Sequence, residues 1–169
     1  MNVLAQSELC RGLIENEIRT LHALSEELQA AAGQVLFREG DEGDGLYLVI
    51  SGELEVLKRD GKGQDRQLAT VGRGAVLGEM SLVQSGAPRS ATVRAMGAVS
   101  LLRLPAARFQ SLLGQDAVAA LKVVRNLARV LSQRIAKLDQ KVIKMLAEAD
   151  AGRHEELSEF QKVLQNWSF

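Results

Sequence analysis

The sequence has few of the features that hold small secreted proteins together or place a chain in a membrane. Cys10 is the single cysteine among 169 residues, which excludes an intramolecular disulfide and a cysteine-ligated metal site. No apolar run approaches the roughly 20 residues of a membrane span, and Met1 is not followed by the pattern of a signal peptide. We therefore expect an unprocessed, cytoplasmic protein that does not bind a membrane.

Charge of one sign is also lacking, because Lys+Arg and Asp+Glu both number 21 and the pI is near 6.8. No global field would attract nucleic acid or an anionic membrane surface, so any anion site must be local. Aromatic residues make up only 4%, but a hydrophobic content of 46% suits one compact domain with an appendage.

Glycine is plentiful but unevenly distributed, since most of the fifteen lie between Gly33 and Gly97. The run Gly40–Gly45 and the pair Asp60-Gly61 have the residue types that sharp turns require. Between such turns the sequence predicts short strands at 34–37, 46–51, 54–58, 66–71, 75–77, 90–95 and 99–104. Many short strands without intervening long helices indicate an antiparallel β-barrel or jelly roll.

Helical patterns flank this region, so the predicted fold class is α+β. Apolar residues at three- and four-residue steps from Ser7 to Ala32 indicate an N-terminal helical cap. Pro105 is placed to open a short helix through Leu113, and a long helix should follow from Ala117 to about Gly152. Its apolar positions form a seam of about four heptads: Leu121, Val124, Ala128, Leu131, Ile135, Leu138, Val142 and Met145.

A heptad seam needs a partner surface. We expect its early part to cover the barrel and its later part to form a homodimer, in which Arg134 at g would face Asp139 at e of the partner. The alternative is that the whole stripe packs within one chain. The expected organisation is residues 1–114 for cap and barrel, 115–149 for the long helix and 150–169 for an amphipathic tail. We expect that tail to fold back on the domain, with docking to a partner as the alternative.

One segment has the residues for chemistry: Gly78-Glu79-Met80-Ser81-Leu82 followed by Pro88-Arg89-Ser90-Ala91. The free N–H groups at the helix start predicted there can bind an anion, and the guanidinium of Arg89 matches the paired oxygens of a phosphate. The carboxylate of Glu79 would repel a bare phosphate. It is useful if the ligand also has hydroxyls, such as a ribose 2′-OH.

With the glycine-rich turn before Tyr47, these motifs resemble the cyclic nucleotide-binding domain family over roughly residues 7–148. The resemblance implies that Glu79 holds the ribose 2′-OH and Arg89 the cyclic phosphate. It also implies that backbone amides around five residues complete the phosphate cradle: Gly78, Met80, Ser81, Ser90 and Ala91. The implied ligand is a 3′,5′-cyclic nucleotide, with no further cofactor.

The resemblance also bears on the choice of base. Members selective for cGMP tend to have a threonine after the cassette arginine and an arginine on the strand before the cassette. Ser90 and Ala69 occupy these places, so we favour cAMP, with cGMP as the alternative. On the long helix, Arg134 or Ile135 lies near the position that meets the purine in bacterial relatives. Arg134 thus has two competing roles, at the base or in a dimer.

Other functions fit the sequence less well. A metal-dependent jelly-roll enzyme needs histidine ligands, but His22 and His154 both lie outside the predicted barrel. A helix-turn-helix transcription factor needs a basic reading helix, whereas residues 152–169 have mixed charge. Neither a catalytic kinase motif nor a channel span is present. We expect a stand-alone receptor, not an enzyme, that signals to an unidentified effector protein; a regulator lacking its own DNA-binding domain is the alternative.

Overall fold

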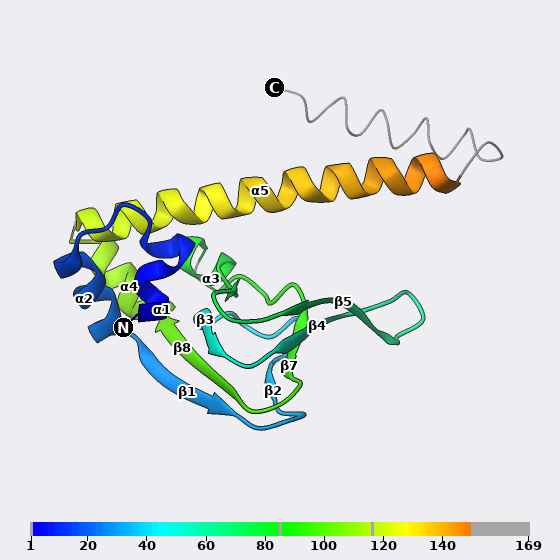
Figure 1. Cartoon of the computed structure of the whole chain (residues 1–169), viewed down its shortest axis with the longest axis horizontal. Helices are drawn as coiled ribbons and strands as arrows, with labels where there is room; N and C mark the ends of the chain where they lie inside the picture. Colours follow the sequence, from blue (N-terminus) through cyan, green and yellow to red (C-terminus); the bar gives the residue numbers. More distant parts are fainter. Residues whose placement is uncertain (1, 85, 116, 150–169) are drawn as a thin grey trace. The chain divides into compact units, whose positions relative to one another are not determined.

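The computed structural model describes residues 2–84, 86–115 and 117–149 (Figure 1). The chain divides into two units, Met1–Ala128 and Arg129–Phe169. The first contains the N-terminal helices, both sheets and the start of the long helix. The expected tail over 150–169, with Leu157, Phe160, Leu164 and Trp167, lies outside the described residues.

The N-terminal segment forms α1 (Asn2–Gln6), the 3-10 helix η1 (Glu8–Cys10) and α2 (Glu15–Leu24). The first turn of α2 is closed by Glu17, whose carboxylate accepts the N–H of Ile14 at 2.8 Å. The same carboxylate pairs with Lys122, and this hydrogen bond holds its pKa below the ordinary value. The predicted helical cap is therefore present as far as Leu24.

Beyond Leu24 the helical prediction is wrong, because Glu26–Ala30 forms strand β1. Its partner is β8 (Val99–Pro105), with Leu28 directly opposite Leu101. The leucine at position 28 fits the helical spacing of the preceding residues, but pairing with a distant strand decides its conformation.

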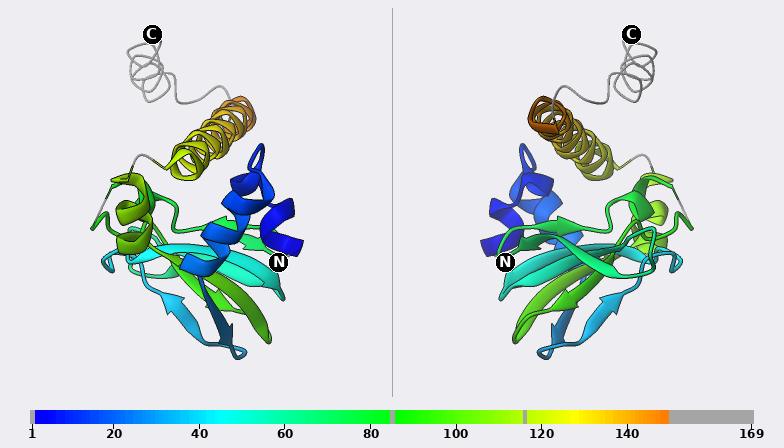
Figure 2. Two further views of the ribbon diagram at one scale, coloured as in Figure 1. Left: turned by 90° about the vertical axis from the view of Figure 1, so that its left-hand side faces the viewer. Right: turned by 90° about the vertical axis from the view of Figure 1, so that its right-hand side faces the viewer.

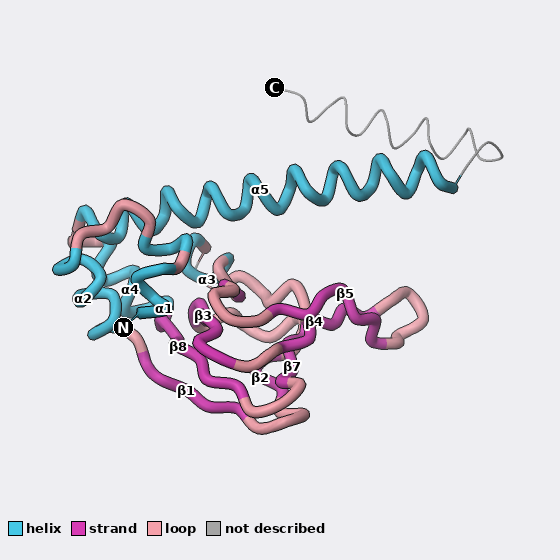
Figure 3. The backbone as a smooth tube through the Cα atoms, in the orientation of Figure 1, coloured by secondary structure: helices cyan, strands magenta, loops and turns pink. Residues whose placement is uncertain are grey.

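The remaining strands are β2 (Val35–Phe37), β3 (Gly45–Ser51), β4 (Leu54–Arg59), β5 (Asp65–Val71), β6 (Val76–Leu77) and β7 (Thr92–Ala95). They make two four-stranded antiparallel sheets in the orders β1-β8-β3-β6 and β2-β7-β4-β5. This confirms the predicted fold class, although the sheets are not closed into a barrel. The β4–β5 hairpin extends to one side and ends in an exposed loop (Figure 3).

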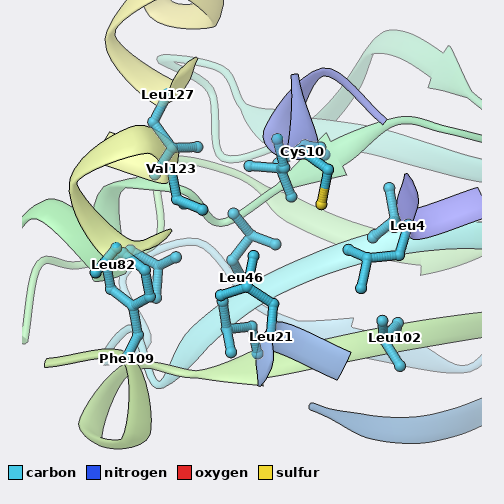
Figure 4. Packing of buried hydrophobic residues seen from close by; sticks show 14 of the residues in the cluster. Leu4, Cys10, Leu21, Leu46, Leu82, Leu102, Phe109, Val123 and Leu127 are labelled. Carbon is cyan, nitrogen blue, oxygen red and sulfur yellow. The ribbon is translucent and has the colours of Figure 1, made fainter. Parts of the chain in front are cut away.

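Two apolar clusters stabilise this arrangement because strand residues alternate between the two faces of a sheet. Tyr47, Val49 and Leu101 belong to the cluster that also includes Leu54 and Val93 of the second sheet. Leu46, Leu48 and Leu102 face the opposite way, toward the helices (Figure 4). Figure 2 shows the N-terminal helices and α4 (Ala106–Leu113) gathered on one side of the strands.

Burial also limits the reactivity of the single cysteine. Cys10 is 3% exposed within the helix-side cluster, and burial raises the pKa of its thiol to about 11. A thiol with this pKa is almost wholly protonated near neutral pH, so Cys10 acts as a small apolar side chain.

The long helix α5 runs from Val118 to Ala149, and Pro105 caps the shorter α4 as the sequence predicts. The start of α5 packs on the domain through Ala120, Val123 and Leu127, none more than 1% exposed. The predicted heptad seam is not the packed face, because Leu121 is 54% exposed and Ala128 is also exposed. The expectation that the early seam covers the domain therefore holds only for Val124, which packs against the helix-side cluster, and is wrong for Leu121 and Ala128.

In the second unit, the seam residue Ile135 is 53% exposed and Leu138 is 59% exposed. The residues of α5 that pack on the first unit, Ala120, Val123 and Leu127, lie on another face of the same helix. Among the described residues, no helix is both long enough and apolar enough to span a membrane, and no His, Cys, Asp and Glu side chains cluster as metal ligands.

Candidate functional site

The glycine-rich turn and the chemistry-bearing segment are joined through their backbones. We use the term cassette for residues 78–91. The N–H of Arg89 donates to Asp41 at 2.8 Å, and its carbonyl accepts the N–H of Gly40 at 2.9 Å. The N–H of Gly43 donates to Ala87 at 3.1 Å. These bonds fix the backbone of Arg89 against the turn, so that its side chain has a defined origin.

The guanidinium of Arg89 is buried, with its side chain only 3% exposed. Its Nη1 donates to the carbonyl of Gly45 at 2.9 Å and to the hydroxyl of Ser81 at 3.0 Å. Its Nη2 donates to Asp44 Oδ1 at 2.6 Å. The Nε atom is buried without a hydrogen-bond partner among the described residues. A buried cation with an unused donor is the chemistry that an anionic ligand satisfies.

Aromatic rings hold the plane of this guanidinium. The Cζ of Arg89 lies 4.3 Å from the ring centroid of Phe37 and 5.4 Å from that of Tyr47. The two rings are 5.5 Å apart, and the Tyr47 hydroxyl donates to Asp44 Oδ1 at 3.3 Å. Burial raises the pKa of the Tyr47 phenol, and the nearby Asp44 carboxylate raises it further. The phenol therefore stays neutral and restrains Asp44 by hydrogen bonding.

Asp44 links the cassette arginine to the opposite sheet. While its Oδ1 accepts from Arg89, its Oδ2 accepts from Arg103 Nη2 at 2.7 Å. Arg103 also donates to Glu26 at 2.8 Å. The alternating charges compensate each other at the edge of the domain, which reduces the cost of burying Arg89.

Gly78 is required by the position of Arg89. A Cβ atom at residue 78 would lie 2.0 Å from Arg89 Nη1 and 2.9 Å from the carbonyl oxygen of Gly45. The φ angle of Gly78 is +70°, a conformation that L side chains rarely adopt. Both the space and the backbone conformation therefore demand glycine here.

The backbone around the cassette offers donors for an anion. Three N–H groups of the cassette, those of Met80, Ser90 and Ala91, donate to no backbone carbonyl of the described residues, apart from any bond between paired strands. Met80 begins the short helix α3 (Met80–Val83), whose first N–H groups lack partners within the helix. The N–H of Ser81, in contrast, donates to Gly78 at 3.2 Å. The side-chain hydroxyl of Ser81 accepts a hydrogen bond from Arg89.

Glu79 lies at the start of α3 and is 8% exposed, and it is the single buried carboxylate in the part of the chain that the structure describes. Its burial distinguishes it from an ordinary surface acid at a helix start. A buried carboxylate is usually matched by hydrogen-bond donors, which a ligand with hydroxyl groups can supply.

The structure thus brings Gly78, Ser81 and Arg89 into direct contact, and Ser90 follows Arg89 along the exit from the cassette. Arg134 belongs to the second unit, in an exposed stretch of α5, so both roles considered for it stay predictions.

Sequence reasoning missed part of the surroundings of Arg89. The turn before β3 is purely structural in the sequence interpretation, but its Asp44 pairs with the buried guanidinium. Tyr47, which in the sequence interpretation only marks the end of the glycine-rich turn, is 6% exposed and its hydroxyl bonds to a side chain. The Gly-Asp-Gly spacing places one acid at the start of β3, which is a signal that could have identified Asp44.

The cassette also connects to the helices. Gln110 of α4 donates to the carbonyl of Leu82 at 2.7 Å, and Leu82 packs with Phe109 (Figure 4). The same cluster includes Val123 and Leu127 of α5. A displacement of α3 would therefore be transmitted by close packing to α4 and to the start of α5.

Comparison with known proteins identifies a family model and relatives that match this chain. Residues 27–116 match the model of the cyclic nucleotide-binding domain. The cyclic AMP receptor protein of Thermus thermophilus is 33% identical over 137 residues, which cover 79% of this chain and 59% of that protein. The chain therefore spans less than two thirds of the length of this relative.

Solved structures agree in sequence and fold. The N-terminal domain of a transcriptional regulator from Streptomyces coelicolor has a TM-score of 0.69 and 33% identity, covering 80% of this chain and 94% of that one. The regulatory domain of Toxoplasma gondii PKA, crystallised with cAMP, has a TM-score of 0.60 and 37% identity. It covers 65% of this chain and 41% of that chain. The protein belongs to the cyclic nucleotide-binding domain family.

Proposed function

We propose that this protein is a cyclic nucleotide receptor that binds cAMP and signals through its long helix, as a regulatory protein and not an enzyme. The observation that supports the proposal most strongly is the buried guanidinium of Arg89, which has an unused Nε donor. The N–H groups of Met80, Ser90 and Ala91, for which the described residues provide no backbone acceptor, lie on the same short segment. Together they suit one compact anion with several oxygens.

In this proposal the cyclic phosphate binds to Arg89 and to the N–H groups of Met80, Ser90 and Ala91. A phosphate diester has a single negative charge, which compensates the buried cation. Asp44 already accepts from Arg89 Nη2. The ligand therefore joins a site whose positive charge is partly balanced, and a rearrangement of Asp44 can accompany binding.

Glu79 supplies selectivity for ribose. Its ionised carboxylate accepts a hydrogen bond from the 2′-OH, and its burial makes the loss of that donor costly. We favour cAMP over cGMP because Ala69 offers no hydrogen-bonding side chain to guanine. The relatives named for cAMP support the same choice.

Signalling follows from the contacts of the cassette. Binding tightens α3 against the ligand, and Leu82 passes the movement to Gln110 and Phe109 of α4. From there the apolar cluster leads to Val123 and Leu127, at the start of α5. A ligand shifts such an equilibrium only by its difference in affinity for the two forms.

The exposed seam of α5 is the output surface, and its partner in this proposal is a second copy of the chain. Apolar residues at heptad spacing, with Ile135 and Leu138 more than half exposed, match the buried positions of a two-stranded coiled coil. Arg134 and Asp139 would then form the flanking charge pair between copies. An effector protein would recognise the ligand-dependent form of this dimer.

Calorimetric titration of the nucleotide-stripped protein with cAMP and then with cGMP tests the proposal. We expect saturable binding of one nucleotide per chain and tighter binding of cAMP. Tighter binding of cGMP would overturn the base assignment but keep the receptor. If neither nucleotide produces a binding isotherm, the proposed receptor function is wrong.

A further inference from the structure

Lys58, which plays no part in the sequence-based site, lies at the exit of the cassette. Its Nζ donates to the carbonyl of Ser90 at 2.9 Å. Lys58 is close to the end of β4, which pairs with β7 immediately after the cassette (Figure 1). A positive charge is therefore hydrogen-bonded to the peptide that follows the phosphate-binding arginine of the proposed function.

The peptide group that receives this bond has a second edge. The carbonyl of Ser90 and the N–H of Ala91 belong to one planar trans peptide, so they point in opposite directions. Ala91 is 9% exposed, and outside the strand ladders its N–H has no backbone acceptor among the described residues. Lys58 thus holds one edge of a peptide whose other edge donates into the proposed phosphate cradle.

Glu39 keeps Lys58 in this position. The Oε1 of Glu39 is 3.1 Å from Lys58 Nζ, and its Oε2 accepts the N–H of Arg59 at 3.0 Å. The N–H of Glu39 donates to the hydroxyl of Thr92 at 3.0 Å. Glu39 is therefore tied to β4, the strand that contains the lysine, and to the neighbouring strand β7. An ion pair as exposed as this one adds little to stability, so a role in stability alone does not account for the arrangement.

We propose that Lys58 is a positioning residue for the cyclic phosphate: its ammonium polarises the Ser90–Ala91 peptide and so strengthens the Ala91 N–H as a donor to the ligand. A charge-assisted hydrogen bond to a carbonyl oxygen increases the donor strength of the N–H in the same peptide. The ammonium also adds a positive charge beside the peptide that borders the proposed phosphate cradle. This inference rests on the proposed function.

The test is calorimetric titration of the nucleotide-stripped full chain with cAMP and cGMP. Lys58→Met removes the charge at nearly constant length, and Lys58→Arg retains it. Lys62→Met removes a charge from the exposed tip of the same hairpin and is the matched control. We expect Lys58→Met to weaken binding of both nucleotides by the same factor, roughly threefold to twentyfold. Lys58→Arg should restore most of the affinity, and Lys62→Met should change it less than twofold.

A spectroscopic readout separates polarisation from a loss of fold. In the cAMP complex, the amide proton of Ala91 should shift upfield in Lys58→Met and return toward its original position in Lys58→Arg. Unchanged affinity in Lys58→Met, an equal loss in Lys62→Met, or an unmoved Ala91 resonance would each overturn this inference while leaving the receptor intact. A wild-type chain that binds neither nucleotide would overturn the inference and the proposed function together.

Discussion

Arg89 is an unusual residue because it is a cation with almost no access to solvent. Carbonyl oxygens, a hydroxyl and the Asp44 carboxylate surround its guanidinium, and an aromatic ring lies 4.3 Å away. Surface arginines do not need such a preorganised environment. The cost of building it is understandable if the planar donor group must be presented to a ligand in one orientation.

Gly78 provides a stability test of this packing. We predict that Gly78→Ala destabilises the fold by about 1–3 kcal/mol, because the new Cβ meets Arg89 Nη1 and the φ angle is positive. Urea unfolding measures the change. Gly61→Ala, at a glycine with nothing within 4 Å of the added Cβ, is the control. Equal stability of the two variants would mean that the cassette backbone is looser than described.

Glu79 has a different signature, which concerns the ligand. Glu79→Ala should cost about 1.5–3 kcal/mol of cAMP binding, since the 2′-OH loses a charged acceptor. Wild-type protein should prefer cAMP to 2′-deoxy-cAMP, and the variant should lose most of this preference. Competition titration with both nucleotides checks it, with the exposed Glu53→Ala as the control. If the variant discriminates between the sugars as well as wild type does, Glu79 does not hold the ribose.

The site residues that could be predicted from the sequence are those that form an uncommon combination of residue types at a fixed spacing. A glycine, an acid and an arginine at cassette spacing stand out without any structure. Asp44, Tyr47 and Lys58 do not, because an acid in a turn, a tyrosine in a strand and a lysine near the end of a strand are common. Their importance depends on Arg89 Nη2 and the Ser90 carbonyl, which approach them only after two sheets have formed.

Among the elements, strands bounded by glycine turns were predictable and β1 was not. Its residues follow α2 with helical spacing, and only the pairing of Leu28 with Leu101 fixes them as a strand. The long helix was predicted correctly in type, but not in its packed face. Ala120, Val123 and Leu127 cover the domain, whereas Leu121 and Ala128 of the predicted heptad seam are exposed and only Val124 of its early part is packed.

The exposed residues of the heptad seam lead to a prediction about assembly. We expect the protein to sediment as a dimer, and Leu131→Glu and Leu138→Glu to sediment as monomers, because a carboxylate in a coiled-coil core lacks a partner. Gln133→Glu adds the same charge at an exposed position outside the seam and should stay dimeric. Runs with and without cAMP show whether the ligand alters assembly. If both seam variants sediment as the unmodified dimer does, the seam is not the interface.

At the scale of the whole molecule, the glycine-rich turn, the cassette and the helix-side cluster are in continuous contact within residues 1–128. The cassette contacts the glycine-rich turn on one side and, through Leu82, the helix-side cluster on the other. In the proposed function, a phosphate bound at the cassette would influence the start of α5 through this packing. The compact unit resembles the regulatory domains of proteins that are larger than this chain.

The most direct test of the account is calorimetric titration of nucleotide-stripped Arg89→Ala with cAMP, beside wild type and the exposed-arginine control Arg19→Ala. Thermal unfolding confirms beforehand that each variant is folded. We predict that Arg89→Ala loses about 2–5 kcal/mol of binding free energy while Arg19→Ala binds as wild type does. Undiminished cAMP binding by a folded Arg89→Ala protein would contradict the assignment of Arg89 to the phosphate, and with it the central claim.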